Sequence, residues 1–166
     1  AIAALLTLAV GIGANTVGFS ILNTLLLRPL PVENPSGLVQ IYTGTSHVSY
    51  PNFRDFEAQS SVFTSVAAHR FVEFNMAEDG LPERVSGEFV SGNYLDVLGI
   101  QAKVGRPLSP DDDRPNAPGA AVISEELWQR RLSSDPDVIG RTVRLNGHVL
   151  TIIGVTPDGF RGTYPI

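Results

Sequence analysis

Charged side chains are absent from the first 27 residues of this 166-residue chain. Eighteen of these 27 residues are apolar, three are glycine, and six are serine, threonine or asparagine. A helix of about 20 such residues spans the hydrocarbon core of a bilayer, which is roughly 30 Å thick. Pro29 and Pro31 follow the run, and prolines at these places are expected to end the helix. The sequence therefore predicts a transmembrane and stalk helix over residues 1–31.

Cysteine is also absent, which excludes catalysis by a thiol and zinc sites with cysteine ligands. The glycine-rich motifs that bind nucleotide phosphates are missing as well. Gly11 and Gly13 lie inside the apolar run, so they are not half of a dinucleotide-binding motif. These absences leave no sequence signal for a cofactor, and we expect none.

Basic clusters are the third absence. The chain carries 12 Lys or Arg residues against 17 Asp or Glu residues, which gives a net charge of −5. An acidic domain is a poor partner for nucleic acid, so we expect no nucleic acid binding. Loops kept in the cytoplasm tend to be rich in Lys and Arg, whereas Arg28 stands alone after the apolar run. We therefore expect residues 32–166 to lie outside the cytoplasm.

A cleaved signal peptide is the alternative interpretation of the N-terminal segment. The apolar part of a signal peptide is about 7–15 residues long, with a cleavage site of small residues after it. The run here is longer and ends in three leucines, Leu25 to Leu27, which favours a retained membrane helix. The chain also begins without Met and within an apolar run. We therefore expect a fragment, with residues 32–166 forming an incomplete domain.

Hydrophobic periodicity and turn signals predict the elements of residues 32–166. Asn146-Gly147 separates two alternating segments and indicates a hairpin, because both residues of its turn need a positive φ. No long βαβ rhythm is visible, so we expect an α+β fold with a mixed or antiparallel sheet. The expected strands lie at residues 38–42, 62–76 with a short break, 83–90, 121–123, 141–145 and 148–155, and helices are expected from residue 50, over 93–98 and after Ser124.

The residues suited to chemistry form no recognisable constellation. His47, His69 and His148 are far apart, and none has a ligand at the spacing that metal sites use. The run Asp111–Asp113 lacks the spaced ligands of a calcium loop, so we interpret it as a solvated loop. Ser124 lacks the flanking glycines of a nucleophile elbow, and helix capping accounts for it. We therefore predict no catalytic residue, no metal site and no enzymatic activity.

Several segments look familiar when they are taken in order. The first are Thr7–Thr16, Phe19–Asn23 and Leu27–Pro31, and the later ones are Gly92–Gly99, Gly105–Leu108, Ala121–Ser124, Trp128 and Ile139–Gly147. Each segment alone is a weak signal, but their order makes the match fairly specific. Together they resemble permease subunits of the MacB-like branch of ABC transporters, and most closely the acidobacterial ADOP-type permeases.

This resemblance implies a location, a mechanism and partners. It implies a bacterial inner-membrane permease whose first helix extends into a periplasmic core domain with a porter-like lobe, here residues 32–166. It also implies a separate cytoplasmic ABC ATPase subunit, whose ATP hydrolysis moves the periplasmic domain by mechanotransmission to export or extract substrate. A second permease copy or homodimer, a periplasmic adaptor and membrane lipid are the further partners that the resemblance implies.

Two other classes of function are compatible with the same sequence. One is a membrane-anchored extracytoplasmic binding or sensing module without transport. The other is an anchored hydrolase, which the missing catalytic constellation disfavours. Three more apolar segments downstream and a neighbouring P-loop ATPase would separate a transporter from a sensor.

Overall fold

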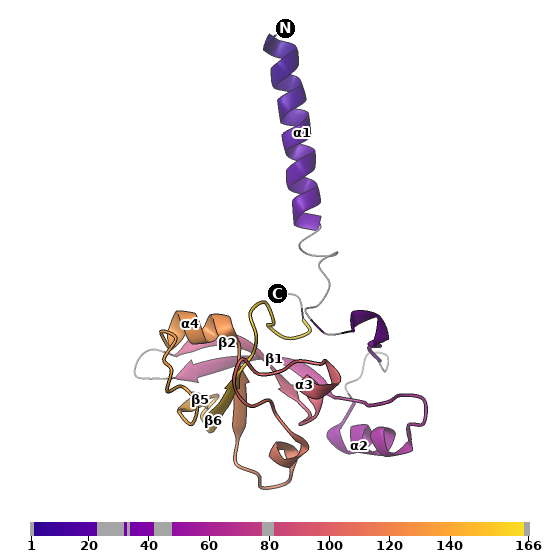
Figure 1. Cartoon of the computed structure of the whole chain (residues 1–166), viewed down its shortest axis with the longest axis vertical. Coiled ribbons are helices and arrows are strands. Elements are labelled where there is room, and N and C mark those ends of the chain that lie inside the picture. The colour runs from indigo at the N-terminus through magenta and orange to yellow at the C-terminus, as the bar shows by residue number, and fades with distance from the viewer. Residues whose placement is uncertain (1, 23–31, 33, 42–47, 78–81, 165–166) are drawn as a thin grey trace. The chain divides into compact units, whose positions relative to one another are not determined.

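The computed structural model describes residues 2–22, 32, 34–41, 48–77 and 82–164 (Figure 1). The chain divides into two compact units. The first comprises Ala1–Leu30 with Pro165–Ile166, and the second comprises Pro31–Tyr164. The second unit contains every strand in the part of the chain that the structure describes.

The first unit contains one long helix, α1 (Ile2–Leu22), of 21 residues. Within this helix, Thr16 Oγ1 donates a hydrogen bond of 2.8 Å to the carbonyl oxygen of Ile12 one turn earlier. None of the helices in the described ranges is long and apolar enough to cross a membrane. The predicted transmembrane and stalk helix over residues 1–31 stays a prediction, and its part from residue 23 to 31 lies outside the described residues.

The second unit is built on one mixed sheet. Only β4 and β6 pair in parallel, and the other described pairs are antiparallel. The strand order is β2-β1-β5-β6-β3, and β4 pairs with β6 as well. The predicted α+β class with a mixed sheet is thereby confirmed. The strands are β1 (His69–Ala77), β2 (Glu83–Val90), β3 (Val104–Gly105), β4 (Ala120–Ile123), β5 (Thr142–Leu145) and β6 (His148–Val155).

The hairpin of β5 and β6 has the predicted turn. Asn146 has a φ of 49° and Gly147 a φ of 85°, so both residues of the two-residue turn adopt the left-handed conformation. Leu145 pairs with His148 directly across the turn. The side chain of Asn146 also accepts a hydrogen bond of 2.9 Å from the backbone N–H of Asn75, which ties the turn to β1.

Short helices and turns connect and cover the strands. Ser49 caps α2 and Ser124 caps α4, each accepting a hydrogen bond from a backbone N–H three residues later. Figure 1 shows α4 lying along the sheet, with α2 and α3 at the other end of this unit. The helical elements are η2 (Pro35–Gly37), α2 (Tyr50–Gln59), α3 (Tyr94–Val97), η3 (Pro110–Asp113) and α4 (Glu125–Arg131).

Two predicted strands are wrong in whole or in part. Residues 38–41 form no strand, and residue 42 lies outside the described residues. The strand predicted from residue 62 begins only at His69. The backbone before it is bonded by side chains instead, since Asn93 donates to the carbonyl oxygen of Val66 and Ser91 Oγ accepts from the N–H of Ala68.

The hairpin of β1 and β2 separates two hydrophobic cores. Because side chains alternate along a strand, Phe74 and Met76 point to one face of the hairpin, and Phe71 and Glu88 to the other. The first core includes Met76, Leu132, Val138, Val143, Ile152 and Val155, and Leu127 and Trp128 of α4 pack against it. The second includes Tyr94, Leu95, Leu98, Ile100 and Phe160, with Val32, Leu38 and Val90 against it.

Candidate functional site

The residues that the sequence offered for chemistry are separated in the structure. Ser124 Oγ accepts a hydrogen bond of 3.2 Å from the N–H of Leu127, so its predicted capping role is confirmed. His148 is exposed at the first position of β6. His47 lies outside the described residues. No group of three or more His, Asp or Glu side chains in the described ranges converges as metal ligands would.

The acidic run is a structural loop, so its interpretation as a solvated loop is wrong for Asp112. Arg106 donates two hydrogen bonds of 2.7 Å to the two oxygens of this carboxylate. The backbone N–H and the hydroxyl of Ser109 donate to it at 2.8 and 2.9 Å. The Arg106 guanidinium, followed by Ser109, holds the pKa of Asp112 well below its ordinary value, against the opposing effect of burial.

Asp113, the next residue, fastens α2 to the turn before α3. Its Oδ2 accepts hydrogen bonds from the Tyr50 hydroxyl at 2.6 Å and from the N–H of Gly92 at 3.1 Å. Burial and this bond raise the pKa of Tyr50. Gly92 is required here because a Cβ would lie 2.2 Å from the carbonyl oxygen of Ser109. Asp112 and Asp113 therefore hold two loops together.

A polar cluster of the described residues lies on the face of the β1–β2 hairpin that carries Phe71 and Glu88. We call it the Glu88 cluster, and it consists of Gln40, His69, Glu88, Tyr94 and Thr163. The Glu88 side chain is only 8% exposed, and three donors meet it. Tyr94 donates to Oε2 at 2.5 Å, while the N–H and the hydroxyl of Thr163 donate to Oε1 at 3.1 and 3.2 Å. One buried carboxylate thus binds α3 and the segment after β6 at once.

His69 extends this cluster on its other side. Its Nδ1 lies 3.2 Å from Thr163 Oγ1, and its Nε2 lies 3.1 Å from the side-chain nitrogen of Gln40. The imidazole also contacts two aromatic rings in tilted arrangements, with centroid distances of 5.7 Å to both Tyr94 and Tyr164. The ring is therefore held by a hydrogen bond at each nitrogen and by two aromatic contacts.

Hydrogen bonding and burial keep the Tyr94 phenol protonated. Burial raises its pKa first, and the hydrogen bond to Glu88 raises it further, to well above the value of free tyrosine. The backbone at Gly162 also comes close to the Glu88 carboxylate. Gly162 has a φ of 104°, and a Cβ there would lie 3.0 Å from Glu88 Oε1. Glycine at this position lets the backbone reach the carboxylate.

Sequence reasoning missed this cluster because its members come from four distant segments. Gln40 follows η2, and Tyr94 begins α3. His69 and Glu88 lie diagonally across the hairpin, since His69 pairs with Val90 and Glu88 with Phe71. Thr163 lies eight residues after β6. The absence of a neighbouring ligand in sequence made His69 uninformative. The available signal was Glu88 itself, an acidic residue within a strand whose alternating pattern was correctly predicted.

A second buried carboxylate was also missed. Glu125 is the first residue of α4, and it is only 6% exposed. Lys103 and Gln129 donate to Oε1 at 2.5 and 3.0 Å, while Oε2 has no hydrogen-bond partner among the described residues. The Lys103 ammonium, on the segment before β3, offsets part of the desolvation cost of this buried carboxylate. The pair joins α4 to that segment.

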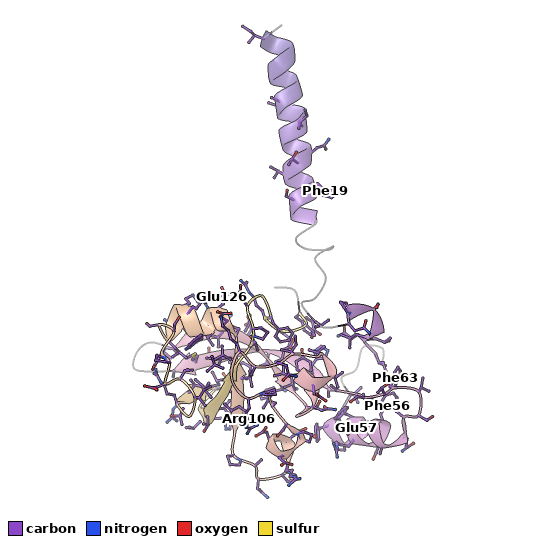
Figure 2. All side chains as sticks on the ribbon, in the orientation of Figure 1. Phe19, Phe56, Glu57, Phe63, Arg106 and Glu126 are labelled. Carbon is purple, nitrogen blue, oxygen red and sulfur yellow. The ribbon has the colours of Figure 1, made fainter. Side chains whose placement is uncertain are left out.

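Two of the hollows on the surface of the described ranges are broad and shallow. One, of about 440 Å³, lies along α2 and includes Asp55 and Phe56 in its lining. Phe56 and Phe63 lie side by side next to it, with ring centroids 6.3 Å apart (Figure 2). The other, of about 250 Å³, lies where β3 meets β6 and includes Ile139. Neither contains a set of side chains arranged for acid–base or nucleophilic chemistry.

The geometry defines an α+β domain in which hydrogen bonds hold loops and terminal segments to a mixed sheet. A model of the family described as MacB-like periplasmic core domain matches residues 1–165. The chain belongs to this family. No curated protein matches the chain.

Two solved structures are similar to it. The crystal structure of the periplasmic region of MacB from Actinobacillus actinomycetemcomitans aligns with a TM-score of 0.55 and 22% identity, covering 63% of this chain and 48% of that one. The extracellular domain of the noncanonic ABC-type transporter YknZ from Gram-positive bacteria aligns with a TM-score of 0.47 and 19% identity, covering 57% and 49%. The chain thus spans about half the length of the solved relatives that it matches. The first likeness establishes the MacB-type fold.

Proposed function

We propose that this chain belongs to the permease subunit of an ABC-type transporter and has no enzymatic activity of its own. In this proposal, ATP hydrolysis by a separate cytoplasmic subunit moves the domain of residues 32–166 by mechanotransmission, for export or extraction of a substrate. The observation that carries the proposal is the family match over residues 1–165.

The proposal places residues 1–31 in and next to the bacterial inner membrane, and residues 32–166 outside the cytoplasm. Its support is the uncharged run, which extends to residue 27, followed by an acidic domain. A second permease copy, a periplasmic adaptor and membrane lipid are the further partners in this proposal. Residues 32–166 are in this view part of a longer core domain, which the 48% coverage of the MacB region supports.

The Glu88 cluster gives the proposed movement a physical route. Gln40, which follows α1 in the sequence, is bonded to His69 of β1, and Thr163, which follows the sheet, is bonded to His69 of β1 and Glu88 of β2. A displacement of either residue therefore acts on the same hairpin. Coupling of this kind needs packed or hydrogen-bonded contacts that have two arrangements.

Spin labels on the intact transporter test the movement. We would place a label at Val149, which is 54% exposed on β6, and measure distances between copies in membranes. The expected result is a distance distribution that changes between nucleotide-free and ATP-bound states. Identical distributions with ATP, with ADP and without nucleotide would contradict mechanotransmission.

A reporter fused after Ile166, with the native residues before Ala1 present, tests the location. Activity of the reporter only in the periplasm is expected, and cytoplasmic activity would contradict the orientation.

A binding or sensing module without transport is the second candidate, and the hollow along α2 is the observation in its favour. Small-molecule or peptide binding there without any nucleotide response would favour this module.

A further inference from the structure

We propose that His69 is a two-sided coupling residue that ties residues 38–41 to residues 162–164, with Glu88 fixing its orientation. The function of this coupling rests on the mechanotransmission proposed above. The coupling itself is a property of the domain alone. It can therefore be tested without nucleotide or a partner subunit.

The first step of the argument is the direction of each hydrogen bond. The side-chain nitrogen of Gln40 has only protons to offer, so His69 Nε2 must accept from it at 3.1 Å. A neutral imidazole with an accepting Nε2 carries its proton on Nδ1. That proton points to Thr163 Oγ1 at 3.2 Å, and His69 is the donor of this bond.

The second step follows the chain of donors to its end. Thr163 Oγ1, having accepted from His69, donates its own proton to Glu88 Oε1 at 3.2 Å. The Thr163 N–H donates to the same oxygen, and Tyr94 occupies the other oxygen at 2.5 Å. The chain of donors that starts at Gln40 therefore ends at the Glu88 carboxylate, and the Tyr94 hydroxyl, 3.1 Å from Thr163 Oγ1, belongs to the same network.

The third step is that Gln40 and Thr163 interact through the ring. The two nitrogens of an imidazole lie on different edges of a rigid ring, so a rotation that loosens one bond also moves the other. The rings of Tyr94 and Tyr164 contact the imidazole in tilted arrangements and restrict its other motions. The positions of the two segments are consequently linked through His69.

The tautomer of His69 gives the first test. The 166-residue chain labelled with ¹⁵N and ¹³C histidine is measured by NMR in mildly alkaline solution, and His69→Gln assigns the signal. The expected result is the neutral form with the proton on Nδ1. In Thr163→Val, which lacks the hydroxyl, this preference should be lost, whereas Thr163→Ser should keep it. A proton on Nε2 in the unaltered chain would overturn the proposal.

Double-mutant cycles give the second test. Gln40→Ala and Thr163→Val are combined, and the unfolding equilibrium constants are compared with the single variants. The double variant should deviate from multiplicativity by a factor of at least about 2. The deviation should vanish when His69 is also replaced by Gln, and Thr163→Ser should behave as the unaltered chain. Multiplicative effects would overturn the coupling.

These outcomes are separable from those for the proposed function. Multiplicative effects in the isolated chain would remove the coupling residue but leave transport possible. An intact transporter without nucleotide-dependent movement would remove mechanotransmission but leave the coupling in place. If Thr163→Val fails to fold, the tautomer of the unaltered chain still decides the proposal.

Discussion

The two faces of the β1–β2 hairpin are organised by different forces. On one face, Ile152, Val138 and Val155 are completely buried, and the core is apolar throughout. On the other, the small core around Tyr94 and Phe160 borders a carboxylate that accepts three hydrogen bonds. Burial of apolar area is non-directional, whereas hydrogen bonds to one carboxylate depend on direction and distance.

This difference separates stability from the capacity to switch. The apolar face is stabilised by many contacts that are lost only together, so it resists local opening. On the Glu88 face, a few directional hydrogen bonds, linked to one another through His69, hold residues 38–41 and 160–164 to the hairpin. The apolar face is therefore suited to holding the sheet together, and the Glu88 face to responding to a displacement.

The largest loss of stability is expected from a change in the apolar core. Ile152→Ala should lower the free energy of unfolding by about 2–5 kcal/mol, because the side chain is completely buried and its loss leaves a cavity. Urea unfolding of the 166-residue chain, followed by the fluorescence of Trp128, measures this change. Val149→Ala on the same strand, where the side chain is 54% exposed, should change it by less than about 0.5 kcal/mol. Equal losses in both variants would contradict the assignment of this core.

The next effect concerns the phenol on the other face. Tyr94→Phe should lower the free energy of unfolding by about 1.5–3 kcal/mol, because a hydrogen bond to a buried charged group is lost. Since the pKa of Tyr94 is raised in the folded state, its contribution is complete below about pH 10 and declines as the pH rises further.

Unfolding measured from neutral to strongly alkaline pH tests this sign. The difference between the unaltered chain and Tyr94→Phe should shrink above about pH 10, as the unfolded phenol ionises. Tyr164→Phe, which removes an exposed tyrosine hydroxyl, is the control. A difference that grows with pH would show that Tyr94 ionises more easily in the folded state.

The sequence predicts the elements of this domain better than its polar contacts. The alternating pattern of Glu83–Val90 and the Asn146-Gly147 turn are local signals, and both elements form as predicted. The segment at residues 38–41 is apolar enough for a strand, but Leu38 packs into the second core instead of pairing. A local pattern cannot reveal which tertiary surface an apolar side chain will cover.

The Glu88 cluster lay beyond prediction for a similar reason. Thr163 and Glu88 are 75 residues apart, and no spacing rule relates them. In the acidic run Asp111–Asp113, the sequence drew attention to the charge of Asp112 but did not reveal that Arg106 is its partner. Arg106 lies only six residues away, yet η3 and its capping box were needed to bring the two together.

The ion pair of Asp112 and Arg106 is partly exposed, so its expected contribution to stability is smaller than that of the buried bonds of Glu88. Its carboxylate is 12% exposed, but the guanidinium is 53% exposed. Asp112→Asn should cost about 1 kcal/mol at neutral pH, because solvent reduces the contribution of a partly exposed pair. Since the pKa of Asp112 is lowered in the folded state, the contribution is complete above the ordinary pKa of about 4 and is lost as the pH falls below it.

Acid unfolding of the two chains measures this dependence. The difference in free energy of unfolding should be constant above about pH 5 and shrink in more acidic solution. Arg114→Gln, which removes an exposed partner of Asp111, is the matched control and should change little at any pH. A difference that increases on acidification would mean that Asp112 is protonated in the folded loop.

The smallest effect is expected where neither burial nor a converging set of bonds is present. Arg54 and Glu57 on α2 form an ion pair of 2.8 Å, with side chains 59% and 29% exposed. Arg54→Ala should change the free energy of unfolding by less than about 0.5 kcal/mol, and 1 M salt should abolish even that difference by screening. Phe53→Ala at the neighbouring, buried position should cost about 3–5 kcal/mol, which shows that α2 itself contributes to stability. If Arg54→Ala were as costly as Tyr94→Phe, direction and burial would not distinguish the Glu88 cluster from an ordinary surface pair, and the contrast between the two faces would fail.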